Sequence, residues 1–343
     1  MKYFFTLLGL LLVTAVCQAQ SITSIQQGQP CSIRGLSVVD DKVAWVSGSK
    51  GHVALSVDGG TTWKWQQVKG FEQSDFRDIE AFSDREAIIM SSGTPALILK
   101  TTDGGTSWKV CYRNNDKAYF LDAMDFIFDG KRGYVMGDPI NGKFLLLETT
   151  DQGTSWKSAA NAPEALPGEA AFAASGTCLK IADDSRIHIV TGGKASRLLS
   201  SFIGKPGNGE WLIEQLPIVH GKDSQGAFSI ASFDRVFKVA VGGDYQVANR
   251  SDSVACNAVL MDDGISGAQL SYNQPAGYQS CVALIKEHTF LSTGTSGTNI
   301  STNRGQHWKQ VDKGSYNVCQ KAKHGNLVLL AGDNGKIAFF KKQ

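Results

Sequence analysis

Ser56-Val57-Asp58-Gly59-Gly60-Thr61-Thr62-Trp63 is the first of four related stretches in this chain. Their shared pattern, S/T-x-D-x-G-x-x-W, returns at 101–108, at 149–156 and, with Asn replacing Asp, at 301–308. We call these stretches the Asp-box motifs. Their key positions are Asp58, Gly60, Trp63, Asp103, Gly105, Trp108, Asp151, Gly153, Trp156, Asn303, Gly305 and Trp308.

Each residue that recurs in the pattern has a physical role in forming a turn. An Asp or Asn side chain accepts hydrogen bonds from the backbone of its own turn, and Gly supplies the positive φ that such a turn needs. The Trp begins the outgoing strand, and its ring can pack beneath the turn. We therefore expect each motif to be a structural turn between two strands.

The spacing of the motifs predicts a β-propeller. Asp58 and Asp103 are 45 residues apart, Asp103 and Asp151 are 48 apart, and Asn303 follows 152 residues later, about three further periods. Periods of this length filled with short strands are typical of propeller blades. We predict an all-β, seven-bladed propeller of four-stranded antiparallel blades over 20–343, with blades beginning near residues 31, 76, 120, 170, 226, 278 and 315.

The blade boundaries rest on a bulky residue at the start of each inner strand. These residues are Ile33, Phe76, Phe120, Phe172, Phe228, Tyr278 and Tyr316. Blades four and five lack the motif, the former around an insertion at 204–209 and the latter around Asp262-Asp263-Gly264. The last blade has three strands of its own, so we expect segment 22–26 to supply the fourth and close the ring by pairing the two ends of the chain.

The N-terminus has the pattern of a secretory signal peptide. Lys2 precedes an apolar run from Tyr3 to Val16, and Cys17-Gln18-Ala19 places small residues before a cleavage site at Gln20. The apolar run is short for a membrane-spanning helix. We expect residues 1–19 to be removed and the protein to be exported to the periplasm or beyond, with no integral membrane segment remaining.

Composition argues against several classes of function. The formal net charge is +2 and no basic block occurs, so nothing indicates nucleic-acid binding. The six cysteines left after cleavage (Cys31, Cys111, Cys178, Cys256, Cys281 and Cys319) are widely spaced and are interpreted mostly as small buried residues. The six His lack metal-ligand spacing, and no dinucleotide or redox motif is present. We expect neither a metal nor a cofactor.

The candidate binding face lies opposite the Asp-box motifs. In an antiparallel blade, the start of the inner strand and the turn between the second and third strands share one face, while the motifs lie on the other. We predict that this face binds a partner through Arg34, Arg77, Asp78, Asp122, Asp138, Glu169, Lys194, Arg197, Asp244, Tyr245, Tyr278 and Ser296.

A purely structural interpretation of some of these residues stays open. Arg34 and Arg77 could pair with Asp78 and Asp122 as ion pairs between blades. Asp138, which precedes Pro139, could simply cap its turn.

The whole mature chain resembles the propellers that serve as photosystem II assembly and stability factors. The resemblance rests on 76–79 (FRDI), 136–139 (MGDP), 241–245 (VGGDY) and 331–338 (AGDNGKIA), together with the motifs and the leader. It implies a seven-bladed, non-catalytic, extracytoplasmic scaffold that binds a protein or envelope complex through an Arg-rich channel face. Only Arg34 and Arg77 fit that face here. Bacterial relatives often carry an oxidoreductase label, which no motif in this chain supports.

Glycoside hydrolysis is the alternative function, with a glycan in place of the protein partner. Sialidases also carry Asp boxes and need three Arg, a Tyr–Glu pair and an Asp acid/base. Arg34, Arg77, Arg197, Tyr245 or Tyr278, Glu169 and Asp78 would fill these roles, but the F-R-I-P start of sialidases is absent.

A hydrolase of neutral glycans could instead use two carboxylates from Asp78, Asp122 and Asp138. A sortilin-like peptide binder would need a cysteine-rich module that this chain lacks. We predict a non-catalytic monomeric binding scaffold.

Overall fold

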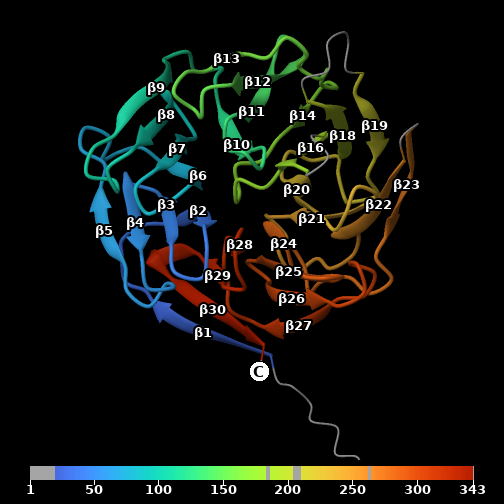
Figure 1. The fold of residues 1–343 in the computed structure, drawn as a ribbon. Coiled ribbons are helices and arrows are strands. Elements are labelled where there is room, and N and C mark those ends of the chain that lie inside the picture. Colours follow the sequence, from blue (N-terminus) through green and yellow to red (C-terminus); the bar gives the residue numbers. More distant parts are fainter. Residues whose placement is uncertain (1–19, 183–185, 204–209, 262–263, 343) are drawn as a thin grey trace, which may run out of the picture.

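Seven antiparallel blades surround a central channel in the computed structural model (Figure 1), which describes residues 20–182, 186–203, 210–261 and 264–342. The proposed leader, the insertion at 204–209 and the Asp262-Asp263 pair lie outside these ranges. The all-β, seven-bladed prediction is confirmed. Blades 1 to 7 are numbered in chain order, and the strands of each blade run outward from the channel.

The first three blades follow the predicted boundaries closely. Blade 1 contains β2 (Ile33–Val38), β3 (Ala44–Gly48), β4 (His52–Ser56) and β5 (Lys64–Gln67). Blade 2 contains β6 (Phe76–Ala81), β7 (Ala87–Ser91), β8 (Ala96–Thr101) and β9 (Lys109–Asn114). Blade 3 contains β10 (Leu121–Phe126), β11 (Gly133–Ile140), β12 (Lys143–Thr149) and β13 (Lys157–Ser158).

The remaining blades complete the ring. Blade 4 contains β15 (Leu179–Ile181), β16 (Arg186–Val190), β18 (Arg197–Phe202) and β19 (Leu212–Gln215). Blade 5 contains β20 (Gln225–Ser232), β21 (Phe237–Asp244), β22 (Ala255–Met261) and β23 (Gly264–Leu270), and its sheet continues inward through β17 (Gly192–Gly193) and β14 (Glu169–Ala170). Blade 6 contains β24 (Cys281–Lys286), β25 (Thr289–Gly294), β26 (Gly297–Ser301) and β27 (Lys309–Asp312). Blade 7 contains β28 (Val318–Lys321), β29 (Val328–Ala331), β30 (Ile337–Lys342) and β1 (Gln20–Gln26), with a short 3-10 turn at Asp333–Gly335.

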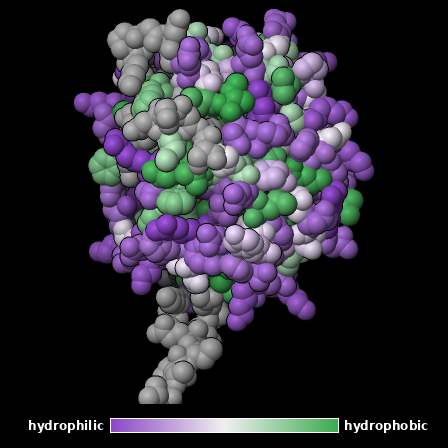
Figure 2. Space-filling model, turned by 90° about the vertical axis from the view of Figure 1, so that its right-hand side faces the viewer, coloured by the Kyte–Doolittle hydropathy of each residue, from purple (hydrophilic) through white to green (hydrophobic). Residues whose placement is uncertain are grey.

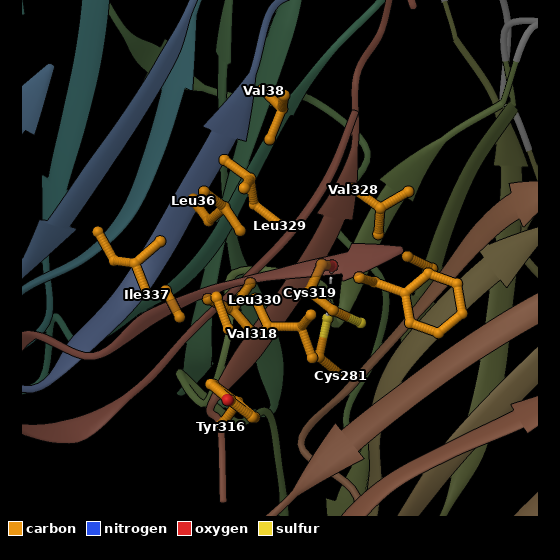
Figure 3. Packing of buried hydrophobic residues seen from close by; sticks show 14 of the residues in the cluster. Leu36, Val38, Cys281, Tyr316, Val318, Cys319, Val328, Leu329, Leu330 and Ile337 are labelled. Carbon is orange, nitrogen blue, oxygen red and sulfur yellow. Dashed lines mark hydrogen bonds between the residues drawn. The ribbon is translucent and has the colours of Figure 1, made fainter. Parts of the chain in front are cut away.

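The two ends of the chain close the ring, as predicted. β1 pairs antiparallel with β30, with Ile22 opposite Phe340 and Ser24 opposite Ala338. Ile22 and Ile25 pack against the apolar cluster shared by blades 6, 7 and 1, part of which Figure 3 shows. Because β1 covers β30, the last blade gains a fourth strand from the opposite end of the chain.

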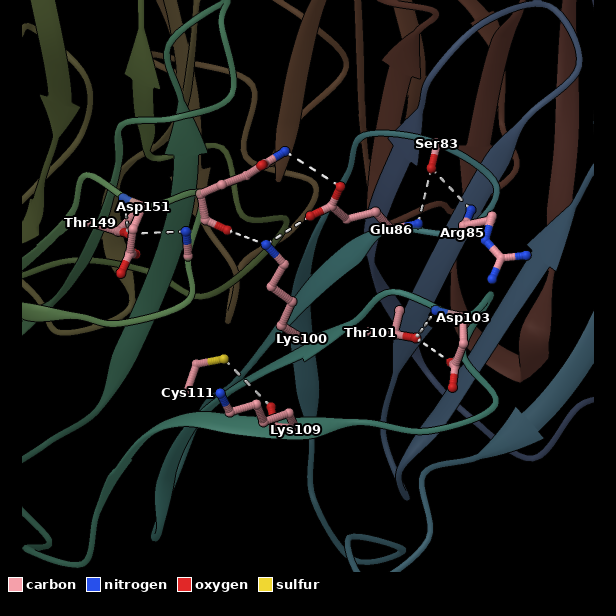
Figure 4. Close-up of polar contacts among 12 residues, drawn as sticks. Ser83, Arg85, Glu86, Lys100, Thr101, Asp103, Lys109, Cys111, Thr149 and Asp151 are labelled. Carbon is pink, nitrogen blue, oxygen red and sulfur yellow. Dashed lines mark hydrogen bonds and ion pairs between the residues drawn. The ribbon is translucent and has the colours of Figure 1, made fainter.

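The Asp-box motifs form the self-bonded turns that the sequence predicts. In the first copy, the Thr62 backbone N–H and hydroxyl donate to the two Asp58 carboxylate oxygens at 2.9 and 2.6 Å, and the Gly60 N–H donates to the Ser56 hydroxyl at 2.8 Å. The Ser56 hydroxyl in turn donates to the Asp58 carboxylate, and Figure 4 shows the equivalent bonds from Thr101 to Asp103 and from Thr149 to Asp151. These exposed Asp side chains gain hydrogen bonds to their charged form, which hold the pKa of Asp103 at about 2.

A second recurring feature is a hydrogen bond that connects the inner strands of neighbouring blades. A side-chain oxygen on one inner strand accepts a backbone N–H from the inner strand of the next blade, which would otherwise face the channel unpaired. The donor–acceptor pairs are Ala81 N with Ser37 Oγ, Met124 N with Asp78 Oδ2, Ile181 N with Asp125 Oδ2, and Val282 N with Ser229 Oγ, at 2.7 to 3.0 Å.

The predicted start of blade 4 is wrong. Phe172 does not begin an inner strand; β15 starts seven residues later, at Leu179. Residues 171–177, which we call the channel plug, cross the channel instead. The Ser175 hydroxyl donates to the Ser280 carbonyl of blade 6 at 2.7 Å, while a Cβ at Gly176 would come within 2.2 Å of the Asp78 carboxyl carbon of blade 2.

In blades 3 and 5, the predicted opening residues Phe120 and Phe228 each lie one position away from the structural equivalent of Ile33. Register shifts at the mouth of the inner strands make Arg34, Arg77, Asp122 and Phe228 structurally equivalent. Each shift bulges one residue out of the ladder. Aligning the opening residues Ile33, Phe120 and Phe228 would instead make Arg34 equivalent to Leu121 and Ser229.

The outer strands of blades 4 and 5 differ from the others. Where a motif precedes the outer strand, that strand begins with a Lys, as at Lys64 and Lys309. β19 and β23 lack this Lys. Figure 2 shows this side of the ring, where apolar patches lie between hydrophilic ones. Exposed apolar side chains of these two blades include Ile213, Met261 and Leu270.

Candidate binding face

Two Arg side chains meet the channel plug on the face opposite the Asp-box motifs, which we call the mouth face. Arg34 donates to the Ala174 carbonyl at 3.2 Å and Arg77 to the Ala173 carbonyl at 3.4 Å. Burial, and next the positive charge of Arg77, lower the pKa of Arg34. The two guanidinium groups therefore lie close enough to repel each other, and each retains N–H donors beyond these single contacts.

In the structure, Arg34 and Arg77 have partners other than Asp78 and Asp122. Arg77 pairs with Asp75, a residue that the sequence reasoning missed, with 2.7 Å between Nε and Oδ2. Asp75 lies two residues before Arg77 at the start of β6, so the spacing alone could have suggested it. Arg34 is bonded to a backbone carbonyl instead of a carboxylate.

Asp78 and Asp122 lie beneath the mouth face. Asp78 accepts the Met124 and Ile79 N–H groups at 2.7 and 2.8 Å, which makes it one of the connections between inner strands. Both carboxyls are buried, and this burial raises their pKa values well above the ordinary range. For Asp122 the nearby charge of Asp138 raises the pKa further. Placing them on the binding face was therefore wrong.

Asp138 supports the plug and does not cap a turn. It lies within β11, before the Asn141-Gly142 turn, and accepts the Ala171 N–H at 3.3 Å. Burial raises the pKa of this carboxyl as well. Asp138 also lines a groove of about 590 Å³ between blades 3 and 4, together with Leu166 and Asp223.

Glu169 and Arg197 form a buried ion pair. Arg197 contacts the two Glu169 carboxylate oxygens at 2.7 and 2.5 Å, and the Thr191 hydroxyl donates to the same carboxylate. Arg197 also donates to the Glu164 carbonyl. A bidentate pair with these additional bonds anchors the strand before the plug, so neither side chain faces a ligand.

An aromatic cluster completes the mouth face. Phe172 of the plug stacks on Phe228 with ring centroids 3.8 Å apart, and Tyr278 meets Phe228 edge-on at 4.9 Å. Tyr278 is only 6% exposed, whereas Tyr245 is 49% exposed. Of the two predicted Tyr residues, Tyr245 therefore has the exposed ring, and the ring of Tyr278 lies against it with centroids 6.5 Å apart.

The remaining predicted residues have smaller roles. Asp244 is buried and accepts from the Gln225 amide at 2.9 Å. The Ser296 hydroxyl donates to the Tyr278 carbonyl. Lys194 is exposed at the rim, where its ammonium donates to the Gly221 carbonyl at 3.0 Å.

The channel itself is hollow on the Asp-box face. A cavity of about 620 Å³ opens there, with Asp78 and Gly176 of the plug among its lining residues. Two ion pairs lie in its lining: Lys323 contacts Glu80 at 2.5 Å, and Lys180 lies 3.5 Å from Asp125. The sequence reasoning missed this cavity because it did not foresee the plug.

Neither metals nor membrane helices are indicated by the described part of the chain. In residues 20–182, 186–203, 210–261 and 264–342, no group of three or more His, Cys, Asp or Glu side chains could hold a metal ion. The same ranges contain no helix with the length and apolar character needed to span a bilayer.

Comparison with known proteins identifies the type of propeller. The family model described as photosynthesis system II assembly factor YCF48 matches residues 20–115 and again 65–183, two matches offset by one 45-residue period. The solved structure "YCF48 bound to D1 peptide" has a TM-score of 0.64 and 17% identity, covering 94% of this chain and 97% of that chain. "YCF48 from Cyanidioschyzon merolae" has a TM-score of 0.61 and 15% identity, covering 93% and 98%. No curated protein matches. The chain is thus a seven-bladed propeller, and its residues 20–183 are similar to the photosystem II assembly factor family.

Proposed function

We propose that this protein is a non-catalytic assembly scaffold that binds a protein partner through its mouth face. The observation that carries the proposal is the adjacent pair Arg34 and Arg77, which use one N–H each on the plug and keep further donors. A solved relative with the same fold is described as bound to a D1 peptide, which supports a peptide segment as the kind of partner.

The chemistry of the mouth face suits an extended peptide. Guanidinium groups donate to carbonyl and carboxylate oxygens, which every peptide segment carries. Tyr245 adds an exposed ring of the amphipathic kind that recurs at protein interfaces. Arg34, Arg77, Lys194 and Tyr245 are the proposed contact residues, and Asp75, Asp138, Phe172, Phe228 and Tyr278 hold them in place.

Export is part of the same proposal. Residues 1–19 have the pattern of a cleaved leader, so we place the protein outside the cytoplasm. N-terminal sequencing of the protein from native cells should begin at Gln20. A chain that retains Met1 in a cytoplasmic fraction would contradict this placement.

Capture of the partner tests the binding proposal. The purified protein is used as bait with solubilised native envelope, beside the double variant Arg34→Ala/Arg77→Ala. As a matched control, Lys64→Ala/Lys109→Ala removes two exposed cations from outer strands. We expect one protein species to be captured by the native and control baits and lost with the Arg variant, with binding at least about tenfold weaker. Equal capture by all three baits would contradict the proposal.

The hydrolase alternative is tested with the same protein. Glu169 and Arg197 are committed to each other, and Asp78 accepts two backbone N–H groups. These contacts disfavour the roles that a sialidase would give them. Fluorogenic glycosides, including a sialoside, should show no turnover. Turnover abolished by Asp122→Asn or Asp138→Asn would favour the two-carboxylate hydrolase instead.

A further inference from the structure

Two thiols from neighbouring blades meet inside the ring. Cys281 lies on β24 of blade 6, Cys319 lies on β28 of blade 7, and both are fully buried. Cys281 Sγ lies 3.3 Å from the Cys319 carbonyl, and Cys319 Sγ lies 3.5 Å from the carbonyl of Leu291 in blade 6. Each side chain thus points across the boundary towards the other blade, and Figure 3 shows the two sulfurs side by side.

The surroundings of Cys281 favour its thiolate. Burial raises the pKa of this thiol, but hydrogen bonds from Cys319, from Thr177 of the plug and from Ser175 outweigh burial and hold it at about 7. A thiolate is the form that attacks a disulfide. Thr177 and Ser175 also bond across the channel to Ser229 and Ser280, so the plug fixes the position of the donors around this sulfur.

The other described cysteines have different neighbours. Cys178 Sγ faces the Met136 sulfur at 4.0 Å, Cys111 is half-exposed on the outer strand β9, and Cys256 is buried within blade 5. Cys31 is buried just before β2 of blade 1, where its carbonyl accepts the Gly335 N–H. Cys281 and Cys319 are therefore the pair whose thiols are in contact in the described part of the chain.

We propose that Cys281 and Cys319 form a disulfide that ties blade 6 to blade 7 when the protein folds in an oxidising compartment. One thiolate attacks the disulfide of a small-molecule or protein oxidant and forms a mixed disulfide. This first step releases one thiolate of the oxidant. The second cysteine thiolate then attacks the protein sulfur of the mixed disulfide, the Cys281–Cys319 bond forms, and the second thiolate of the oxidant leaves. Two electrons pass to the oxidant, and the two thiol protons go to the oxidant's thiolates or to solvent.

The position of this bond gives it a consequence for the whole ring. Blade 7 contains the first and the last described strands of the chain, and β1 is held to it by strand pairing and apolar packing. A bond from β24 to β28 closes a loop of about 38 residues and restricts the unfolded chain. It therefore reinforces the boundary between the closing blade and its neighbour. This inference does not depend on the partner-binding proposal.

Refolding under defined redox conditions tests the disulfide. The protein is unfolded, refolded in a glutathione buffer containing glutathione disulfide, alkylated and digested without reduction. Mass spectrometry should detect a peptide pair linked through Cys281 and Cys319. Thermal unfolding of the oxidised protein should begin roughly 5–10 °C above that of the reduced protein.

Matched variants show whether the shift in melting temperature comes from the Cys281–Cys319 disulfide or from oxidation elsewhere in the protein. Cys178→Ala and Cys256→Ala should keep the shift in melting temperature, whereas Cys319→Ala should lose it. If Cys319→Ala fails to fold, peptide mapping of the unaltered protein decides alone. Free Cys281 and Cys319 thiols after oxidative refolding, or their linkage to other cysteines, would overturn the proposal.

Discussion

At the scale of single residues, charge and burial decide which predicted site residues can meet a partner. Arg34 and Arg77 stay at the mouth because a guanidinium keeps its charge and can share its donors with the plug. Asp78 and Asp122, equally polar in the sequence, are buried instead. Their carboxyls belong to the support of the mouth face.

Asp122→Asn should stabilise the folded protein at neutral pH. Burial raises the folded-state pKa of Asp122 above its unfolded value, so its contribution to stability is full at pH below the unfolded pKa and is lost as the pH rises through the folded one. An amide of the same shape avoids this loss. Between pH 4 and 8, the melting temperature of the variant should rise relative to that of the native protein as the pH increases. A constant difference across this range would contradict the assignment.

At the scale of elements, the Asp-box turns do more than reverse the chain: the Gly of each motif touches the blade before it. Gly153 lies against Ile88 of blade 2, and Gly60 lies against Leu329 of blade 7. Each self-bonded turn therefore also seals a boundary between blades. This explains why the Gly recurs with the Asp, which the sequence reasoning had attributed to turn geometry alone.

Gly153→Ala should destabilise the protein more than Gly142→Ala. Both glycines have positive φ, +72° and +79°, so both variants incur backbone strain of about 1 kcal/mol. A Cβ at Gly153 would also lie 2.2 Å from Ile88 Cδ1, whereas Gly142 faces open space. Urea unfolding should give Gly153→Ala an additional loss of roughly 1–3 kcal/mol. Equal losses would show that the turn does not seal the boundary.

The ring of blades could be predicted from the sequence, whereas the channel plug could not. The motif spacing and the three-stranded last blade determine the ring and its closure, because both follow from local patterns. Phe172 misled the prediction because an aromatic residue before a small apolar run resembles an inner strand. Only contacts with distant blades, such as that of Gly176 with Asp78, reveal the plug. The ion pair between Glu169 and Arg197, which lie 28 residues apart, could not be predicted from the sequence pattern either.

At the scale of the whole molecule, the ring is closed at blade 7 and plugged through its centre. The pairing of β1 with β30 joins the ends of the chain, and the plug contacts blades 1, 2, 3, 5 and 6. The mouth face is therefore a filled surface, while the hollow of the channel opens on the other side.

Ile22→Ala/Ile25→Ala should weaken the whole ring by loosening its closure. The two side chains pack on the cluster shared by blades 6, 7 and 1, so their truncation should cost roughly 1–2 kcal/mol each. Thr23→Ala/Ser24→Ala, which alters two exposed side chains of the same strand, is the matched control and should stay within about 0.5 kcal/mol of the native protein. Denaturant unfolding measures both, and similar losses in the two variants would argue against a closing role for β1.

The central claim, that the partner binds the mouth face, is tested most directly by site-specific photo-crosslinking in intact cells. A photoreactive residue replaces Tyr245 on the mouth face or, in a second protein, Val57, which is 57% exposed on an Asp-box turn. We predict a crosslink from position 245 to one envelope protein and none from position 57. A crosslink to that protein from position 57 alone would place the partner on the Asp-box face and contradict the account.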